Sequence, residues 1–185
     1  MSRRIITSLA SAEWAGLFTG FTRSAFRLEA LQHAADPDEE EAFVRFLAGQ
    51  DPGVDLSWWI ELAKGHTAAG RRMCRVRVVI EPPSDYTRFE LAHFPAMAEA
   101  GDDIRIIVAG PGTWPAGMPR HDFWLFDDRD VWVLNYDDAG MFLSAELQTD
   151  RRVITDHLCW RDAALRQSIP VREYLAMSAR RVSAN

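Results

Sequence analysis

Residues 72–109 read RMCRVRVVIEPPSDYTRFELAHFPAMAEAGDDIRIIVA, and this stretch decides the fold class. Apolar side chains alternate along residues 72–80, which is the period of a β-strand. Ser84 is placed to cap a helix that runs to about residue 100, where Gly101 ends it. Residues 103–109 then form a second apolar strand. This order indicates a βαβ unit, so we expect the two strands to be parallel and connected right-handedly.

The segment that follows predicts antiparallel strands. A loop rich in Gly and Pro, residues 110–119, is long enough to cover a site. Residues 121–126 and 131–136 are two apolar strands around an Asp-rich turn. A second turn leads into a third strand at residues 141–147. We therefore expect an antiparallel meander next to the parallel unit.

The flanks of this sheet are mainly helical in pattern. Residues 25–31 alternate apolar and charged side chains and favour an edge strand over a helix. Ser168 and Pro170 are placed to cap and start a short final helix. The predicted fold is a single α/β domain, in which helices from both termini flank a small mixed sheet. Its parts are a mainly helical N-terminal layer, a sheet core, C-terminal helices and a frayed tail, at residues 1–70, 71–147, 148–177 and 178–185.

The charge balance argues against two classes of partner. The formal net charge is -6 and the isoelectric point is about 5.4. Binding to nucleic acid or to an anionic membrane depends on Lys and Arg, so we expect neither partner. The sequence has no apolar run of about 18 residues and no signal-peptide pattern. We expect a cytoplasmic protein, and no pattern predicts a cofactor.

Two arginines are candidates for an anion pocket. Arg27 and Glu29 share one face of the strand predicted at residues 25–31, while Arg88 and Glu90 lie early in the helix that crosses the sheet. Arg is well suited to pairing with carboxylate or phosphate. The alternative is an Arg–Glu network that braces the N-terminal layer against the sheet. The sequence leaves both interpretations open and favours the network.

Clustered Asp residues raise the question of a metal. Asp127, Asp128 and Asp130 lie on one predicted turn, and Asp137 and Asp138 lie on the next. Carboxylate oxygens suit divalent cations. Asp is also a preferred turn residue, and the regular spacing of a calcium loop is missing. We therefore expect turn chemistry and no metal site.

Seven short stretches, spread over most of the chain, carry a family resemblance. They are FTRSAFRLE, RVRVV, YTRFE, AGDDIR, DFWLFD, WRDAA and IP, at residues 21–29, 75–79, 86–90, 100–105, 122–127, 160–164 and 169–170. From about residue 21 to 175 the chain resembles an actinobacterial family, domain of unknown function 6879. Similar proteins tend to be encoded near helix-turn-helix regulators and small acidic proteins. The resemblance therefore implies a regulatory role.

His121 and Asp128, seven residues apart, carry a second and more remote resemblance. Residues 72–147 are similar to one half of a phospholipase D superfamily protein. In that superfamily His attacks phosphorus, a Lys two residues later neutralises the phosphoryl oxygens, and Asp orients a His. Phe123 stands where the Lys would be, which implies a catalytic architecture without catalysis. An enzyme would need a substitute cation, such as Arg120 or Arg105, and a second half-site from a homodimer.

These patterns lead to one favoured function and three alternatives. We expect a non-catalytic regulatory or sensor module that acts through a protein partner, either a transcription regulator or a small acidic protein. The first alternative is a phosphodiesterase or nuclease-like enzyme with His121 and Asp128 as catalytic candidates, and the others are a small-ligand-binding domain and a direct DNA binder. If a pocket exists, we expect its lining to be Arg27, Arg88, His121, Phe123, Trp124 and Asp128.

Overall fold

A computed structural model describes residues 4–35 and 39–183 of the chain. The strands are β1 (Ile5–Ile6), β2 (Ser24–Glu29), β3 (Arg72–Ile80), β4 (Asp102–Ala109), β5 (Asp122–Phe126), β6 (Asp130–Tyr136), β7 (Phe142–Gln148) and β8 (Ile169–Pro170). The helices are α1 (Ala12–Gly20), α2 (Glu40–Leu47), α3 (Ser57–Ala68), α4 (Asp85–Glu99), α5 (Arg151–Gln167) and α6 (Val171–Ser183).

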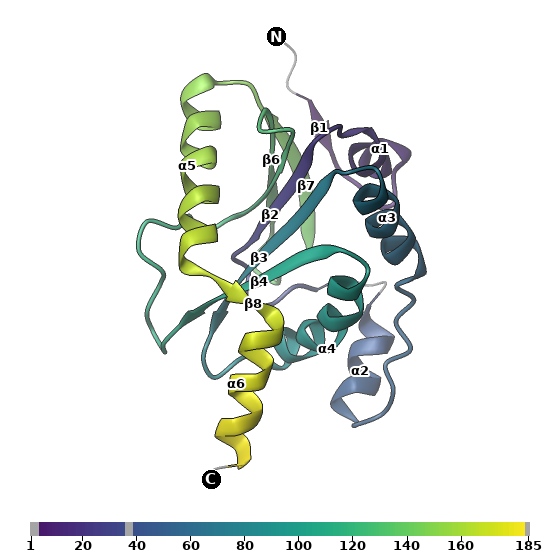
Figure 1. Cartoon of the computed structure of the whole chain (residues 1–185), viewed down its shortest axis with the longest axis vertical. Coiled ribbons are helices and arrows are strands. Elements are labelled where there is room, and N and C mark those ends of the chain that lie inside the picture. The colour runs from purple at the N-terminus through teal and green to yellow at the C-terminus, as the bar shows by residue number, and fades with distance from the viewer. Residues whose placement is uncertain (1–3, 36–38, 184–185) are drawn as a thin grey trace.

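The eight strands of the described residues belong to one mixed sheet, with helices on both faces (Figure 1). Its strand order is β1-β7-β6-β5-β2-β3-β4-β8. The predicted βαβ unit is confirmed, since β3 and β4 pair in parallel and α4 connects them. The Ser84 hydroxyl accepts the backbone N–H of Thr87 and caps this helix, as its position predicted. The predicted meander is also confirmed, because β5, β6 and β7 pair antiparallel in sequence order.

The largest difference from the sequence prediction concerns β2. It was expected at an edge of the sheet, yet it lies between β5 and β3, antiparallel to the first and parallel to the second. Arg27 and Glu29 made one face of this strand look exposed, whereas the Glu29 side chain is only 3% exposed. The N-terminal 70 residues therefore contribute an inner strand to the sheet as well as helices.

The two faces of the sheet carry different side chains. One face packs Leu28, Val76 and Phe123 against residues of α5. The apolar side chains of the inner strands β2, β3 and β5 gather on this face. The opposite face is covered by α1 and α3 at one side and by α4 at the other. Between these helices the inner strands present charged residues in place of apolar ones. This second face positions the candidate site.

The C-terminal segment also differs from its prediction. Ser168 ends α5, and Ile169 and Pro170 form β8 beside β4. Helix α6 then continues to Ser183, where the sequence predicted a frayed tail from residue 178. The short strands β1 and β8 form the two edges of the sheet. In the described part of the chain, no helix has the length and apolarity to cross a membrane.

Candidate functional site

A cavity of about 910 Å³ lies over the second face of the sheet. Its walls come from α1, α3, α4, the segment before α1 and the turn between β6 and β7. Charged side chains from the sheet and α4 line it at Arg27, Glu29, Arg75 and Glu90. Aromatic side chains line it at Trp14, Phe18, Trp58, Trp59, Tyr86, Trp124, Tyr136 and Phe142.

The charged floor follows from the register of two parallel strands. Arg27 on β2 lies opposite Arg75 on β3, and Glu29 lies opposite Arg77. One Glu29 oxygen, Oε1, accepts hydrogen bonds from Arg27 Nε and from a terminal Arg75 nitrogen, each at 2.7 Å. The side chains of Arg27 and Arg75 are 14% and 12% exposed. A single carboxylate therefore holds two largely buried guanidinium groups in place.

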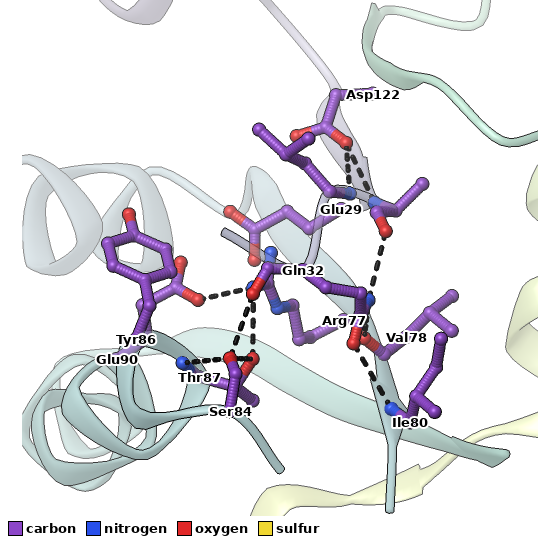
Figure 2. A network of polar contacts seen from close by, with 12 residues as sticks. Glu29, Gln32, Arg77, Val78, Ile80, Ser84, Tyr86, Thr87, Glu90 and Asp122 are labelled. Atoms are coloured by element: carbon purple, nitrogen blue, oxygen red, sulfur yellow. Dashed lines mark hydrogen bonds and ion pairs between the residues drawn. The ribbon is translucent and has the colours of Figure 1, made fainter. Parts of the chain in front are cut away.

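Asp122 joins this floor to the backbone at the end of β2. Its Oδ2 accepts a bond from Arg27 at 3.1 Å, and its Oδ1 accepts the N–H groups of Ala30 and Leu31 at 2.7 and 2.9 Å. Figure 2 shows both backbone contacts. The carboxylate thus satisfies two N–H groups at the point where the chain leaves the sheet.

A second contact between an arginine and a glutamate lies deeper under α4. A terminal nitrogen of Arg77 on β3 is 2.6 Å from Glu90 Oε2, and the two side chains lie together near Tyr86 (Figure 2). The Arg77 side chain is 3% exposed. Burial raises the pKa of Glu90 to about 8, even though Arg77 acts in the opposite direction. The protonated form of Glu90 is therefore favoured at neutral pH.

Glu29 shows the opposite behaviour to Glu90. Burial alone would raise its pKa, but the nearby guanidinium groups of Arg75, Arg27 and Arg77 outweigh burial and lower it. Glu29 is therefore ionised. With Arg27 and Arg75 positive, Glu29 negative and Glu90 mostly neutral, these four groups carry a net charge of about +1 at neutral pH.

The guanidinium groups also contact the aromatic walls. The carbon at the centre of the Arg27 guanidinium lies 5.3 Å from the ring centroid of Trp124, and the same carbon of Arg75 lies 5.2 Å from Trp59. Phe18 packs edge-on against Trp124, with 4.9 Å between the ring centroids. These cation–π and aromatic contacts fix the indole rings at the wall of the cavity.

Among the described residues that line the cavity, three buried polar atoms lack a hydrogen-bond partner, besides Glu90 Oε2, which faces Arg77. They are Glu29 Oε2, an acceptor, and Arg75 Nε and Trp124 Nε1, which are donors. Buried polar atoms in proteins are nearly always hydrogen-bonded, and each exception calls for an explanation. Because all three side chains line the cavity, a bound molecule could supply the missing partners.

The segment of residues 30–35, which we call the strap, closes one side of the cavity. The Gln32 side chain donates to the carbonyl of Val78 at 2.8 Å and accepts the N–H of Ile80 at 3.2 Å (Figure 2). It thereby occupies the position that a longer β2 would take beside β3. At the other end, the Ala35 N–H donates to the carbonyl of Gly140 at 3.0 Å. The strap is thus attached at both ends.

The predicted lining residues do not come together. Arg27 and Trp124 line the cavity, but Arg88 is exposed on α4 and pairs with Asp85. Phe123 is fully buried in the core against α5, on the opposite face of the sheet. Successive residues of a strand point to opposite faces, so Phe123 and Trp124 could not line one pocket.

His121 and Asp128 lie at opposite ends of β5. Nε2 of His121 is 3.2 Å from Nε2 of His157 on α5, whereas Asp128 pairs with Arg161. A five-residue strand with one flanking residue at each end spans roughly 20 Å. These positions place the two halves of the proposed phosphodiesterase motif in separate surroundings.

The Asp-rich turns hold backbone and side-chain donors. Asp127 accepts three backbone N–H groups, Asp130 pairs with Arg129, and Asp137 accepts the N–H groups of Ala139 and Met141. Within residues 4–35 and 39–183, no three His, Cys, Asp or Glu side chains gather as a metal site would require.

The prediction missed Arg75 and Arg77, which alternate with Val76 and Val78 along β3. A signal was present, because strands of a parallel unit are covered on both faces and seldom carry charge. Two arginines in such a strand indicate buried partners. The aromatic wall residues of α1 and α3 gave no comparable signal, since amphipathic helices commonly carry them.

Two comparisons with known proteins bear on the chain. A search of curated proteins found no match. A family model with the description "Domain of unknown function (DUF6879)" matches residues 12–176. The matched range contains every charged residue of the pocket floor.

Proposed function

The chain belongs to the DUF6879 family, and on this premise we propose that it is a non-catalytic sensor domain whose cavity binds a small organic molecule. One observation carries the proposal. A cavity of about 910 Å³ has, at its wall and floor, two buried donors, Arg75 Nε and Trp124 Nε1, and a buried acceptor, Glu29 Oε2, that lack hydrogen-bond partners. Ligand sites typically combine an apolar lining with a few fixed polar groups, and this cavity has that composition.

The rigidity of the floor supports binding as the role. Arg27 is held by Glu29 and Asp122, and Arg75 is held by Glu29, so the polar groups are oriented before a ligand arrives. A site with oriented groups loses less entropy on binding. Burial of these ion pairs costs solvation energy, which is consistent with a role beyond stability.

A search for ligands with a fragment library tests this proposal. Ligand-detected NMR on the whole chain would identify fragments, and Ala15→Phe would fill the cavity from the wall that α1 provides. Ala12→Phe, on the same helix but exposed and outside the lining, is the matched control. We expect Ala15→Phe to weaken fragment binding at least tenfold and Ala12→Phe to leave it unchanged. Thermal melting would establish that both variants fold.

Fragments that bind both variants equally would place the site elsewhere and contradict the proposal. A library in which no fragment binds the unmodified chain would also contradict it.

A second candidate function is an acid–base enzyme that uses the same cavity. The opposite pKa shifts of Glu29 and Glu90 are the observation that favours it, because such pairs divide the roles of base and acid. It ranks lower, since the guanidinium contacts that lower the pKa of Glu29 also make it a weak base. Turnover that Glu90→Gln abolishes without weakening binding would favour this candidate.

The remaining expectations from the sequence stay predictions. They are the protein partner, the possible homodimer, and the phosphodiesterase alternative with its phospholipase-D-like origin. Purification of the tagged chain with and without a ligand of the cavity would test whether a partner depends on the bound state.

A further inference from the structure

We propose that the ligand of the cavity carries a carboxylate group and that Arg75 is the residue that binds it. This inference rests on the proposed function and specifies the chemistry of its ligand. Arg75 lies on β3 in the floor of the cavity, opposite Arg27 of β2 in the register of the two strands. Residues opposite each other on neighbouring strands point to the same face of a sheet, so both arginines belong to one floor.

The guanidinium group of Arg75 has one edge that the described residues leave without an acceptor. Its Nη1 donates to Glu29 Oε1 at 2.7 Å, whereas Nε and Nη2 form the other edge of the planar group. Nε is buried without a hydrogen-bond partner, and no contact within the described ranges joins Nη2 to an acceptor. Arginine binds carboxylates through two parallel N–H···O bonds from one edge, so the open edge of Arg75 matches a carboxylate.

Asp102 does not complete this edge. Its Oδ2 lies 3.9 Å from Arg75 Nε, which is too long for a hydrogen bond, and accepts the indole N–H of Trp59 at 3.0 Å. Burial also raises the pKa of Asp102, which disfavours its charged form. Asp102 therefore leaves the donors on this edge of Arg75, and part of its charge, unmatched.

The charge of Arg75 is the reason to expect an anion and not a neutral acceptor. Arg27 has hydrogen bonds to two carboxylates, Glu29 and Asp122. Arg75 has a hydrogen bond to Glu29 alone, and it shares the oxygen Oε1 with Arg27. A buried cation without a counter-charge of its own has lost solvation energy, and a bound carboxylate offsets that loss more fully than an amide does.

The acidic residues of the lining do not prevent such binding. Glu29 contacts Arg75 through Nη1, and two guanidinium nitrogens at 2.7 Å already balance its charge. Burial keeps Glu90 mostly protonated at neutral pH, and Glu39 lies near the Tyr86 hydroxyl, at 3.5 Å. The attraction for an anion is therefore local to the open edge of Arg75.

The aromatic walls predict the body of the ligand. The central guanidinium carbon of Arg75 lies 5.2 Å from the ring centroid of Trp59. The ring centroids of Trp58 and Trp124 lie 5.9 and 6.1 Å from that of Trp59. A carboxylate at Arg75 would therefore have its apolar part beside several indole rings. Such surface packs against either a flat aromatic body or an alkyl chain, and the experiment distinguishes these two sources.

Calorimetric titration of the whole chain with matched acids and amides tests the inference. 2-Naphthoate and 2-naphthamide form the aromatic pair, octanoate and octanamide form the alkyl pair, and only the acids carry a charge at pH 7. We expect at least one acid to bind at least tenfold more tightly than its amide, and the acid that binds identifies the body of the ligand. 2-Naphthamidine, a cation of similar shape to 2-naphthoate, should bind more weakly than that acid.

Arg75→Gln provides the mutational arm. It removes the charge and the open edge, so we expect the bound acid to lose at least tenfold in affinity and the preference for acid over amide to disappear. A merely structural role would weaken acid and amide alike and leave the preference intact. Arg105→Gln is the matched control, because Arg105 lies on the neighbouring strand β4, opposite Val76 and outside the cavity lining. It should leave both affinities unchanged.

A side-chain NMR measurement tests the same contact without any substitution, and so does not depend on the folding of Arg75→Gln. The Nε–H resonance of Arg75 can be assigned through the bonds of its own side chain. We expect it to shift downfield when the acid binds, because a charge-assisted hydrogen bond forms at a donor that has no partner in the protein. The amide should shift it less.

Several outcomes would overturn the inference. An amide or the amidine that binds as tightly as the acids would refute the preference for a carboxylate, and so would failure of both acids to bind. An unchanged Nε–H resonance in the acid-bound chain, or a preference for acid that survives in Arg75→Gln, would refute the role of Arg75. In each case, fragment hits that Ala15→Phe abolishes would leave the sensor proposal standing, so the two failures are distinguishable.

Discussion

Asp127 shows how much one side chain contributes to this fold. Its carboxylate accepts the N–H groups of Thr22, Arg23 and Ser24, and the Thr22 hydroxyl, at 2.7 to 3.1 Å. Burial would raise its pKa, but these hydrogen bonds lower it to about 2. Its contribution to stability is therefore complete above its ordinary pKa and is lost as the pH falls through about 2.

We predict that Asp127→Ala lowers the free energy of unfolding by about 2–4 kcal/mol, because several buried N–H groups lose a charged acceptor. Urea unfolding at pH 7 would measure the change. Asp128→Ala is the control, since Asp127 and Asp128 have φ angles of 53° and 58° and share the same backbone strain. Asp128 is more exposed, so Asp128→Ala should lower the free energy of unfolding clearly less than Asp127→Ala does. Equal losses would show that the turn conformation, and not the carboxylate, is responsible.

Sequence patterns identified some residues of the site and missed others for a physical reason. Arg27 was recognised because its alternation with Glu29 is a local pattern. Arg88 was chosen for the same reason, although it faces solvent beside Asp85. Which arginine is buried depends on how α4 lies over the sheet, and this is a long-range property. The position of Asp127 opposite residues 22–24 is also a contact between distant segments.

Among the elements, the strap connects the cavity to the rest of the structure. Its Ala35 N–H reaches the carbonyl of Gly140 in the turn between β6 and β7. Gly140 has a φ of 87°, and a Cβ there would lie 2.7 Å from the carbonyl oxygen of His33. Only glycine fits between the turn and the strap without displacing one of them.

We predict that Gly140→Ala detaches the strap and lowers the free energy of unfolding by more than about 2 kcal/mol. The strain of a left-handed backbone conformation and the clash of the new Cβ with the backbone both contribute to this loss. Gly112→Ala is the matched control, since Gly112 has a φ of 68° and open space around its Cβ position. Gly112→Ala should lower the free energy of unfolding by about 1 kcal/mol, from backbone strain alone. Amide hydrogen exchange at Ala35 would increase only in the Gly140 variant. Protection of that amide in both variants would contradict the prediction.

The elements themselves were predictable where their signals are local. The boundaries of β3 and the cap of α4 follow from alternation, proline and serine within the segment. β2 was misplaced at an edge because buried charge has the same pattern as solvent-exposed charge. The two-residue strands β1 and β8 carry almost no local pattern, and their partners fix them.

At the scale of the whole molecule, buried charge makes stability depend on pH. The pKa of Glu90 is about 8 in the folded chain, mainly because of burial, and returns to its ordinary value near 4.5 on unfolding. Between these values the unfolded chain releases a proton that the folded chain retains. The contribution of Glu90 to the free energy of unfolding is therefore fully present below about pH 4.5 and is lost as the pH rises through about 8.

We predict that Glu90→Gln removes this dependence. The free energy of unfolding of the unmodified chain should decrease from pH 5 to 8.5 relative to that of the variant, measured by urea unfolding at each pH. Glu99→Gln, an exposed position on the same helix, should reproduce the unmodified profile. A constant difference between the unmodified chain and Glu90→Gln across this range would disprove the assignment.

The general architecture could be predicted, because the spacing of apolar residues distinguishes strands from helices and their order along the chain indicates a mixed sheet flanked by helices. The cavity could not, since it arises where three helices, a strap and a turn leave space over the sheet. The same limit applies to the network beneath it. Its members come from β2, β3, α4 and β5, and their proximity is set by the order of the strands.

The two edge strands have a consequence for encounters between copies of the chain. Within the residues that the structure describes, β1 pairs with β7 only at Glu146 and Ala145, and β8 pairs with β4 only at Arg105 and Ile106. The outer rows of N–H and C=O groups on β7 and β4 are therefore each covered near the middle by a short strand. In β8, Pro170 has no N–H that could pair with another strand. An incoming chain finds no continuous template for strand addition, so aggregation through the sheet edges is suppressed.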